Sequence, residues 1–395
     1  MQSPAKLPRP VVLLGIAALL NDTASEMIYP LLPVFLSTTL GASPAVVGLI
    51  EGLADGLASI LKYFSGWWSD RAKRRKPLIV TGYGLAAASR ALIASATMWP
   101  LVLTARLIDR TGKGMRSAPR DAMISDVTPR EDRGRAYGFH RALDHTGAIV
   151  GPLLALFFMQ LVGVDLRTMM FIAVIPGAAA ALMLAVLLRE QRDEGGRLQD
   201  DPSSTPSFSP PPSSFPSFRS AIVAIALFSL ANSSDAFLLL QAHAAGVSAA
   251  MLPLLWAAHH VIKSLFSTRA GALSDRVDRR WLLVAGWTSY AAIYFLFPFA
   301  STLTTFVILF VAYAIPFTLS EGAERAWIAD LVPAEARGKS FGIYYLANGL
   351  CVLAGTALFG IIWQTWSPRA AFFTGAALAL CAVAAVLSTR RPSAA

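Results

Sequence analysis

The sequence predicts an all-α membrane protein in which twelve spanning helices form two related six-helix bundles. Of its 395 residues, 55% are hydrophobic and 15% are charged, whereas about a quarter of the residues of a soluble domain are charged. The stretches 168–188, 281–300 and 370–388 contain no charge, and each is long enough to cross a ~30 Å hydrocarbon layer as a helix. A loop pattern that occurs twice indicates the two bundles.

Apolar runs separated by charged or turn-rich breaks define the spans. The predicted spans are 11–37, 44–68, 77–95, 97–117, 136–162, 168–189, 219–243, 247–268, 281–300, 303–324, 339–363 and 369–389. The halves, 1–189 and 219–395, are joined by the Pro- and Ser-rich segment 190–218, which we expect to be a flexible cytoplasmic linker. The apolar run after Lys6 and Arg9 is followed by no small-residue cleavage site, so we expect it to be retained as the first span.

Charge divides the loops between the two membrane faces. The cations of one set of loops are Arg71, Lys73, Arg74, Arg75, Lys76, Arg116, Arg120, Arg130, Arg133, Arg135, Arg276, Arg279, Arg280, Arg337, Lys339, Arg390 and Arg391. The opposite loops are short, and their cations are the exceptions Arg167 and Arg369. Because positive loops stay in the cytoplasm, we expect an inner-membrane protein with both termini inside. These positively charged loops account for the net charge of +10, so we expect no nucleic-acid partner.

The pattern Gly-x-x-x-Asp-Arg-x-x-Arg-Arg follows the second span and occurs again after the eighth. At an offset of 205 residues it pairs Gly66 with Gly271, Asp70 with Asp275, Arg71 with Arg276, Arg74 with Arg279 and Arg75 with Arg280. A second pair of loops, DVTPREDRGRAYG at 126–138 and DLVPAEARGKSFG at 330–342, has an offset of 204. Two unrelated loops that recur at nearly one spacing indicate a duplicated six-span unit, and parallel halves around a midplane cavity are typical of transporters.

With these loops, twelve spans and a long central loop, the whole chain resembles the major facilitator superfamily. The resemblance implies that the ten paired residues form a conformational latch, which braces the cytoplasmic side in the outward-facing state. We expect Asp70 to accept hydrogen bonds from the amides that open span eleven, near Ser340–Gly342. By the repeat, Asp275 is expected to face the start of span five, near Ala136–Gly138.

Span five also contains GAIVGP, with Gly147, Gly151 and Pro152. This segment resembles a motif of the exporting, antiporter branches of the superfamily. The alternative is ordinary close packing of helices through small residues.

Nine ionisable residues lie at membrane depth, where an uncompensated charge costs about 2.5–3.5 kcal/mol or more. They are Asp22, Glu26, Arg90, Arg106, Asp144, His145, Asp235, His259 and His260. Asp22, Glu26 and Asp235 have no cation one turn away in their own spans, so each needs a partner from another span or a proton. We expect Asp22 and Glu26 to carry the proton first, with Arg90 or Arg106 as modulator, and Asp144 second.

The remaining ionisable groups have simpler alternatives. Helical i,i+3 spacing pairs Arg106 with Asp109 and Arg141 with Asp144. Joint metal ligation by His259 and His260 is not expected, because adjacent side chains point about 100° apart on a helix. Glu321, Glu324 and Arg325, at the end of span ten, either form an ion pair between the halves or are a solvated helix end.

The favoured function is proton-driven efflux, by antiport and alternating access, of a small, largely apolar or amphipathic solute. One alternative is proton-coupled uptake of an anionic metabolite held by Arg90 and Arg106. Another is export of a metal ion or chelate through Asp22, Glu26 and His259. The sequence has no HExxH, GxSxG or GK[ST] pattern, so neither an enzyme nor an ATP-driven pump is expected. We expect a monomer in the lipid bilayer with no cofactor and no resident metal.

Overall fold

The computed structural model describes residues 6–32, 35–42, 44–72, 74–189, 216–233, 237–238, 252–300 and 302–389. Asp235, Arg390, Arg391 and segment 190–215 of the predicted linker lie outside these ranges. Within the described ranges the regular structure is helical, and each predicted span overlaps one or more helices. The end of the seventh predicted span and the start of the eighth, residues 239–251, lie outside the described ranges. The helices are α1 Arg9–Ile28, α3 Pro44–Ala72, α4 Lys76–Ala94, α5 Trp99–Asp126, α6 Arg133–Leu156, α7 Leu166–Leu187, α8 Pro216–Ala231, α10 Leu252–Ser274, α11 Arg279–Leu296, α12 Leu303–Ala312, α13 Ala314–Asp330, α14 Arg337–Thr365 and α15 Pro368–Ser388.

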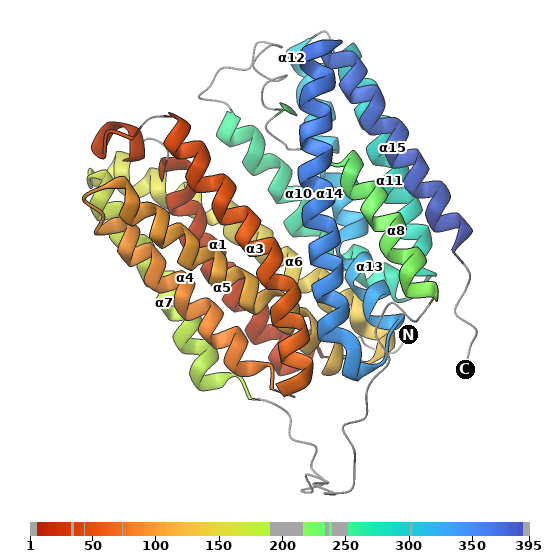
Figure 1. Ribbon diagram of the computed structural model, residues 1–395, viewed down its shortest axis with the longest axis horizontal. Coiled ribbons are helices and arrows are strands. Elements are labelled where there is room, and N and C mark those ends of the chain that lie inside the picture. Colours follow the sequence, from red (N-terminus) through yellow and green to blue (C-terminus); the bar gives the residue numbers. More distant parts are fainter. Residues whose placement is uncertain are drawn as a thin grey trace, which may run out of the picture.

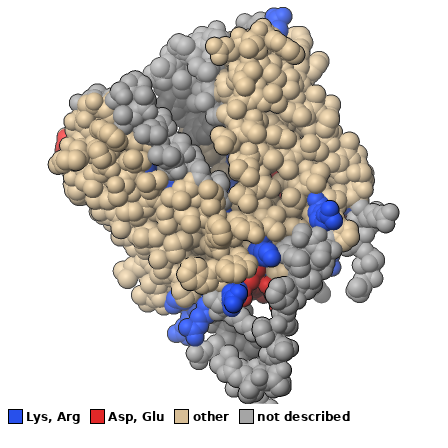
Figure 2. All heavy atoms as spheres, in the orientation of Figure 1, with Lys and Arg blue, Asp and Glu red and all other residues tan. Residues whose placement is uncertain are grey.

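The outer surface is apolar. On α7, Ile175, Leu182 and Val186 are 66%, 67% and 65% exposed and lie along one stripe of the helix. Eight helical segments of the described chain are long and apolar enough to cross a membrane. Figure 2 shows that Lys and Arg gather at one end of the molecule, below a body that is largely uncharged. The fold is therefore that of a membrane protein whose apolar side chains face lipid.

Several helices change form where proline interrupts the hydrogen-bond ladder. After α1 the chain forms a 3₁₀ turn at Tyr29–Leu31, which contains Pro30. The predicted tenth span is two helices, α12 and α13, that meet at Tyr313. Pro316 has no amide hydrogen to donate to the carbonyl four residues earlier, which favours this break. A second break follows Pro152, where α6 continues as a π-helix at Phe157–Val162 and ends at Gly163 with φ of 77°.

The predicted end of the fourth span at residue 117 is wrong. Helix α5 continues to Asp126 through the charged sequence around Arg116 and Arg120, which are 6% and 9% exposed. This position differs from the cytoplasmic loop that the sequence predicts for both arginines. They lie in the wall of a cavity inside the protein, where Arg116 donates to the carbonyl of Gly82 at 3.1 Å and Arg120 lies 2.8 Å from Asp121.

The exceptional cation Arg167 has a local structural function. Its guanidinium donates to the carbonyl oxygens of Ala94 and Ala96, both at 2.8 Å, at the carboxyl end of α4. The carbonyls at a helix end lack intrahelical partners, and a cation near them is favourable. Asp165 starts α7 next to it by accepting from the amide of Arg167 at 3.1 Å.

The helices form two groups that lie side by side (Figure 1). One contains α1, α3, α4, α5, α6 and α7, and the other contains α8 and α10 to α15. The most extensive contacts between the groups join α6 to α10 and α3 to α14. These are spans five with eight and two with eleven, which a twofold rotation that exchanges the halves would interchange. The pseudo-twofold arrangement predicted from the repeat is confirmed.

Candidate functional site

A cavity of about 340 Å³ lies between the two groups of helices. Its first-half wall comes from α1, α3, α4, α5 and α6, and its second-half wall from α8, α13 and α14 with Asn232, which follows α8. Six cationic and four acidic side chains line it: Lys62, Lys113, Arg116, Arg120, Arg141 and Arg325, and Asp22, Asp144, Glu321 and Glu324. The cavity is thus strongly polar, and cations prevail in it.

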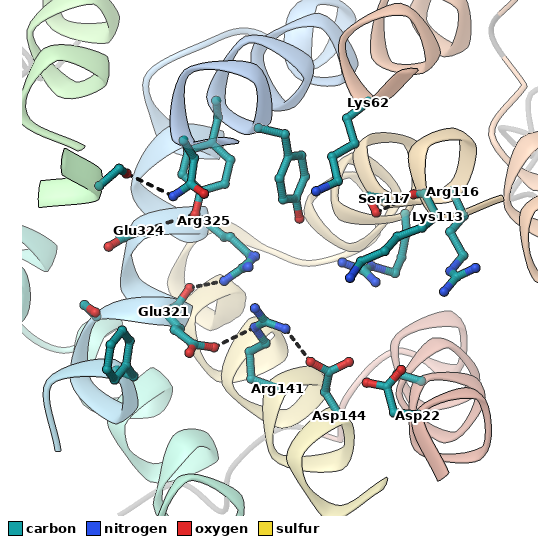
Figure 3. A pocket seen from close by; sticks show the side chains of 18 of the residues that line it. Asp22, Lys62, Lys113, Arg116, Ser117, Arg141, Asp144, Glu321, Glu324 and Arg325 are labelled. Carbon is teal, nitrogen blue, oxygen red and sulfur yellow. Dashed lines mark hydrogen bonds and ion pairs between the residues drawn. The ribbon is translucent and has the colours of Figure 1, made fainter. Parts of the chain in front are cut away.

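Asp22 on α1 and Asp144 on α6 form a carboxyl pair in this cavity. Their carboxyl groups face each other (Figure 3) and are placed to share a hydrogen bond. Two carboxyl groups form such a bond only when one of them carries a proton. Asp22 also accepts a hydrogen bond of 2.9 Å from the side chain of Asn21. The geometry therefore suits a pair that holds one proton between two helices.

Arg141 joins this pair to the other half of the protein. Its guanidinium binds Asp144 on α6, as the spacing predicted, and lies 2.8 Å from Glu321 on α13 (Figure 3). Lys263 on α10 also lies 2.8 Å from the Glu321 carboxylate. The predicted ion pair between the halves is confirmed for Glu321, and it lies in the wall of the cavity.

Asp121 on α5 makes a second connection between the halves, and the sequence analysis did not identify it. Its carboxylate lies 2.8 Å from Arg120 on α5 and 3.2 Å from Arg325 on α13. The hydroxyl of Tyr345 on α14 donates to the same carboxylate. Asp121 is 1% exposed. The charged sequence at the end of α5 is the signal for this site, but charge of this kind also predicts a loop.

Glu26 and the two arginines predicted to modulate it lie away from the main cavity. Glu26 packs against Gly151 on α6. Arg90 donates to the side-chain oxygen of Asn21 at 2.9 Å, and Arg106 lies 3.6 Å from Asp109, which confirms that predicted pairing. Together, Arg90, Arg106 and Asp109 border a much smaller cavity. Arg90 and Arg106, which the sequence offers as a clamp for an anionic metabolite, are therefore not among the residues that line the main cavity.

The three histidines predicted for the site, His145, His259 and His260, also lie outside the lining of the main cavity. His145 on α6 and His260 on α10 approach at 3.2 Å between their Nδ1 atoms, across the boundary between the halves. His259 is 3% exposed and packs against the rings of Phe310 and Tyr313. Among the residues that the structure describes, no group of three or more His, Cys, Asp or Glu side chains is placed to hold a metal ion.

Asp70 and Asp275 each accept hydrogen bonds from the opening amides of a helix in the other half. Gly338 and Lys339, at the start of α14, donate to Asp70 at 2.9 and 2.6 Å. Gly134 and Arg135, at the start of α6, donate to Asp275 at 2.7 Å each. The predicted helix starts are the right ones, although the donors lie one or two residues before the predicted ranges. The starts of α14 and α6 both lie beside the arginine-rich loops.

Gly66 and Gly271 allow these helices to approach closely. A Cβ on Gly66 would overlap the carbonyl oxygen of Gly338, and a Cβ on Gly271 would overlap that of Gly134. Glycine is therefore required at both positions because the backbone of the opposite half fills the space.

The predicted pairing of the repeat arginines is wrong by one residue. Arg75 lies 3.2 Å from Asp70 and 2.7 Å from Asp126, whereas its structural counterpart is Arg279, which lies 2.8 Å from both Asp275 and Asp330. Arg75 is the fifth residue after Asp70, whereas Arg279 is the fourth residue after Asp275. Arg279 begins α11, which the side chain of Asp278 caps. In the first half no side chain caps α4, which begins one residue after Arg75.

The other predicted latch arginines have different surroundings. Arg71, Arg74 and Arg276 are exposed, and Arg280 binds Asp278 and the carbonyl of Thr389 within its own half. Two arginines that we had not included complete the latch instead. Arg337 lies 2.9 Å from Asp126, and Arg133 lies 2.6 Å from Asp330. We define the latch as Asp70, Arg75, Asp126 and Arg337 with their counterparts Asp275, Arg279, Asp330 and Arg133.

Gly147 and Gly151 lie against α1. A Cβ on Gly147 would lie 2.5 Å from the carbonyl oxygen of Leu19, and one on Gly151 would lie 2.7 Å from that of Thr23. The two glycines therefore permit close packing of α6 on α1, which holds Asp144 next to Asp22.

The comparison with family models decides the classification. The model of the major facilitator superfamily matches residues 14–258 and 223–395. The chain belongs to the major facilitator superfamily. It is 29% identical over 382 residues to an uncharacterized MFS-type transporter of Methanocaldococcus jannaschii, which covers 95% of this chain and 93% of that protein.

Two further similar proteins are informative. Over 134 residues the chain is 32% identical to the multidrug resistance protein MdtH of Yersinia pestis, which covers 34% of this chain and 33% of that protein. The structure of the fucose:proton symporter FucP of E. coli matches with a TM-score of 0.76 and 17% identity, over 97% of this chain and 99% of that one. At this identity, the likeness to FucP concerns the MFS fold alone.

Proposed function

We propose that this MFS transporter is a proton-coupled secondary transporter that moves a small solute through the central cavity by alternating access. The observation that carries the proposal is the carboxyl pair of Asp22 and Asp144 on the cavity wall. The proton affinity of two carboxyl groups that share a proton depends on their surroundings. When the two halves of a transporter rock, the surroundings of the groups that line its cavity change in every cycle, so the proton can be bound on one side and released on the other. Arg141 connects the pair to Glu321 in the other half.

The latch supports alternating access. Two symmetric sets of charge-assisted hydrogen bonds join the halves at the arginine-rich end, which we propose to be cytoplasmic. In this conformation the cytoplasmic side is closed, so the cavity would exchange with the opposite face. Transport in either direction requires that the latch breaks and forms again.

Efflux by proton antiport is one candidate direction. It is supported by the similarity of a third of the chain to the multidrug resistance protein MdtH and by the motif containing Gly147, Gly151 and Pro152. Uptake together with protons is the other candidate, and the excess of cations in the cavity supports it, because a bound anion and a proton compensate each other.

Transport into proteoliposomes with an imposed pH gradient tests both candidates. Antiport predicts accumulation of a bound solute when the lumen is acidic, and symport predicts accumulation when the outside is acidic. We expect Asp22→Asn and Asp144→Asn to abolish the gradient-driven accumulation while exchange of solute across the membrane continues. Normal gradient-driven accumulation in both variants would show that the carboxyl pair is not the coupling site.

A further inference from the structure

Two cations of the cavity form no ion pair with a carboxylate of the described residues. Lys113 and Arg116 both lie on α5 and line the cavity. Among the described residues, no Asp or Glu forms an ion pair with either, whereas Arg120, Arg141 and Arg325 are each paired. Lys113 is exposed to the cavity, and Arg116 donates to the carbonyl of Gly82 at 3.1 Å and lies over the ring of Tyr83.

Unpaired positive charge at membrane depth requires compensation. Removing an ion from water is costly unless an opposite charge or water replaces its hydration. Because no described carboxylate forms an ion pair with Lys113 or Arg116, a bound anion is the partner that their positions favour. Their i,i+3 spacing places the two side chains on one face of α5, so a single carboxylate or phosphate group suits both.

The opposite wall of the cavity has a different character. Around α8 and α14 the second half contributes the neutral hydrogen-bonding groups Ser229, Asn232 and Asn348, together with the ring of Phe228. The charged side chains of this wall, Glu321, Glu324 and Arg325, come from α13. The side chain of Asn348 donates to Ser229 at 3.0 Å. A ligand that spans the cavity would therefore have its charge at α5 and an uncharged, hydrogen-bonding or aromatic body towards α8 and α14.

We infer that the substrate is a small organic anion whose charged group binds Lys113 and Arg116, and that it binds together with the proton of the Asp22–Asp144 pair. This inference rests on the proposed proton-coupled transport and deepens it. Lys113 and Arg116 lie within electrostatic reach of Asp22. The positive charge of Lys113 and Arg116 favours the ionised form of Asp22. A bound anion would offset this charge, so the carboxyl pair would keep or gain a proton. By thermodynamic linkage, protonation of the carboxyl pair strengthens anion binding by the same factor by which the anion strengthens proton binding.

Several other groups contribute to the field at the carboxyl pair. The charged and titratable groups that face it are Glu26 on α1, Tyr83 and Arg90 on α4, Lys113 and Arg116 on α5, and His140, Arg141 and His145 on α6. Of these cations, Lys113 and Arg116 lie on the cavity wall without a carboxylate partner in the described chain, so an anionic ligand acts first on them. Binding of anion and proton together corresponds to symport, and a cationic substrate would instead compete with the proton.

The test measures equilibrium binding to the purified full-length protein in lipid nanodiscs, without a gradient. The probes are benzoate, succinate, methanesulfonate and glycerol 3-phosphate, with benzamide, succinamide, dimethyl sulfone and glycerol as neutral counterparts and tetraphenylphosphonium as a cation.

We expect at least one anion to raise the melting temperature while its neutral counterpart does not. Lys113→Gln should weaken binding of that anion about 10-fold to 100-fold, because charge-assisted hydrogen bonds to it are lost. Lys113→Arg should retain binding, and Lys6→Gln, at an exposed position, is the matched control.

Proton uptake is measured with a pH indicator in weakly buffered solution. We expect anion binding to make the solution more alkaline in the wild type, and this change to disappear in Asp22→Asn while the anion still binds. Equal binding of neutral counterparts, stabilisation by the cation alone, no binding by any anion, or anion binding without proton uptake would each overturn the inference. Anion binding with proton uptake but no gradient-driven transport would instead contradict the proposed transport function and leave the anion site in place.

Discussion

The guanidinium of Arg141 on α6 lies 2.8 Å from the carboxylate of Glu321 on α13, across the boundary between the halves. The same guanidinium binds Asp144, and Glu321 also binds Lys263 on α10 at 2.8 Å. Protonation of Asp144 would leave Arg141 with Glu321 as its carboxylate partner in the described chain. Arg141 is therefore placed to communicate the protonation of the carboxyl pair to the contact between the halves.

Replacing Glu321 by Gln should favour opening at the arginine-rich end. The substitution leaves Arg141 and Lys263 without their shared carboxylate, and breaking a buried ion pair costs about 3–5 kcal/mol. We expect a lower melting temperature and a longer distance between spin labels on Arg74→Cys and Arg276→Cys, two exposed positions on opposite halves.

The control for this measurement is Glu335→Gln, which removes the same charge at an exposed position in the 3₁₀ turn before α14. Labelling requires a background in which Cys351 and Cys381 are replaced by Ser. An unchanged label distance in Glu321→Gln, with wild-type stability, would mean that this ion pair does not hold the halves together.

The two glycines at the contacts between the halves provide a symmetric prediction. Alanine at Gly66 or Gly271 would overlap a backbone carbonyl of the opposite half, so each substitution should separate the arginine-rich ends and lengthen the label distance. Overpacking of this kind typically costs about 1–3 kcal/mol. Gly84→Ala is the matched control, because its Cβ has no neighbour within 4 Å. A change in only one of the two variants would contradict the symmetric latch.

The corrected register of the repeat makes a third prediction. Arg279→Ala removes contacts with Asp275 and Asp330 and should destabilise the protein by about 3–5 kcal/mol, as Arg75→Ala should to a similar degree. Arg280→Ala should cost less than about 1 kcal/mol, because its ion pair with Asp278 is local and partly solvated. Denaturant titration of the three variants measures the order, and a larger effect at Arg280 than at Arg279 would support the original offset of 205.

The sequence predicted the spans and the repeat because both depend on local patterns. Hydropathy identifies segments that must face lipid, and the repeated Gly66 and Asp70 identify a position where two helices meet. The offset of 205 could not give the counterpart of Arg75, because Arg75 is five residues after Asp70 whereas Arg279 is four residues after Asp275. It also could not give the exact amides that bind Asp275, since helix ends vary by one or two residues.

The cavity was predicted less well, because depth along a helix does not tell which way a side chain points. Arg106 has the depth of a substrate ligand but faces Asp109. Arg116 and Arg120 were assigned to a loop because hydropathy treats charge as the end of a span. Inside a transporter, charge instead marks the helix that lines a wet cavity.

The last prediction separates the two interpretations of Gly147. If this glycine serves mainly to pack α6 on α1, Gly147→Ala should lower stability by about 1–3 kcal/mol, because its Cβ would meet the carbonyl of Leu19 and the Cβ of Asp22. The same displacement should weaken gradient-driven transport by moving Asp22 away from Asp144. Melting temperature and transport in proteoliposomes are measured together, with Gly84→Ala as control. Loss of transport at wild-type stability would argue for a specific role of the motif in antiport, since packing alone would have changed both.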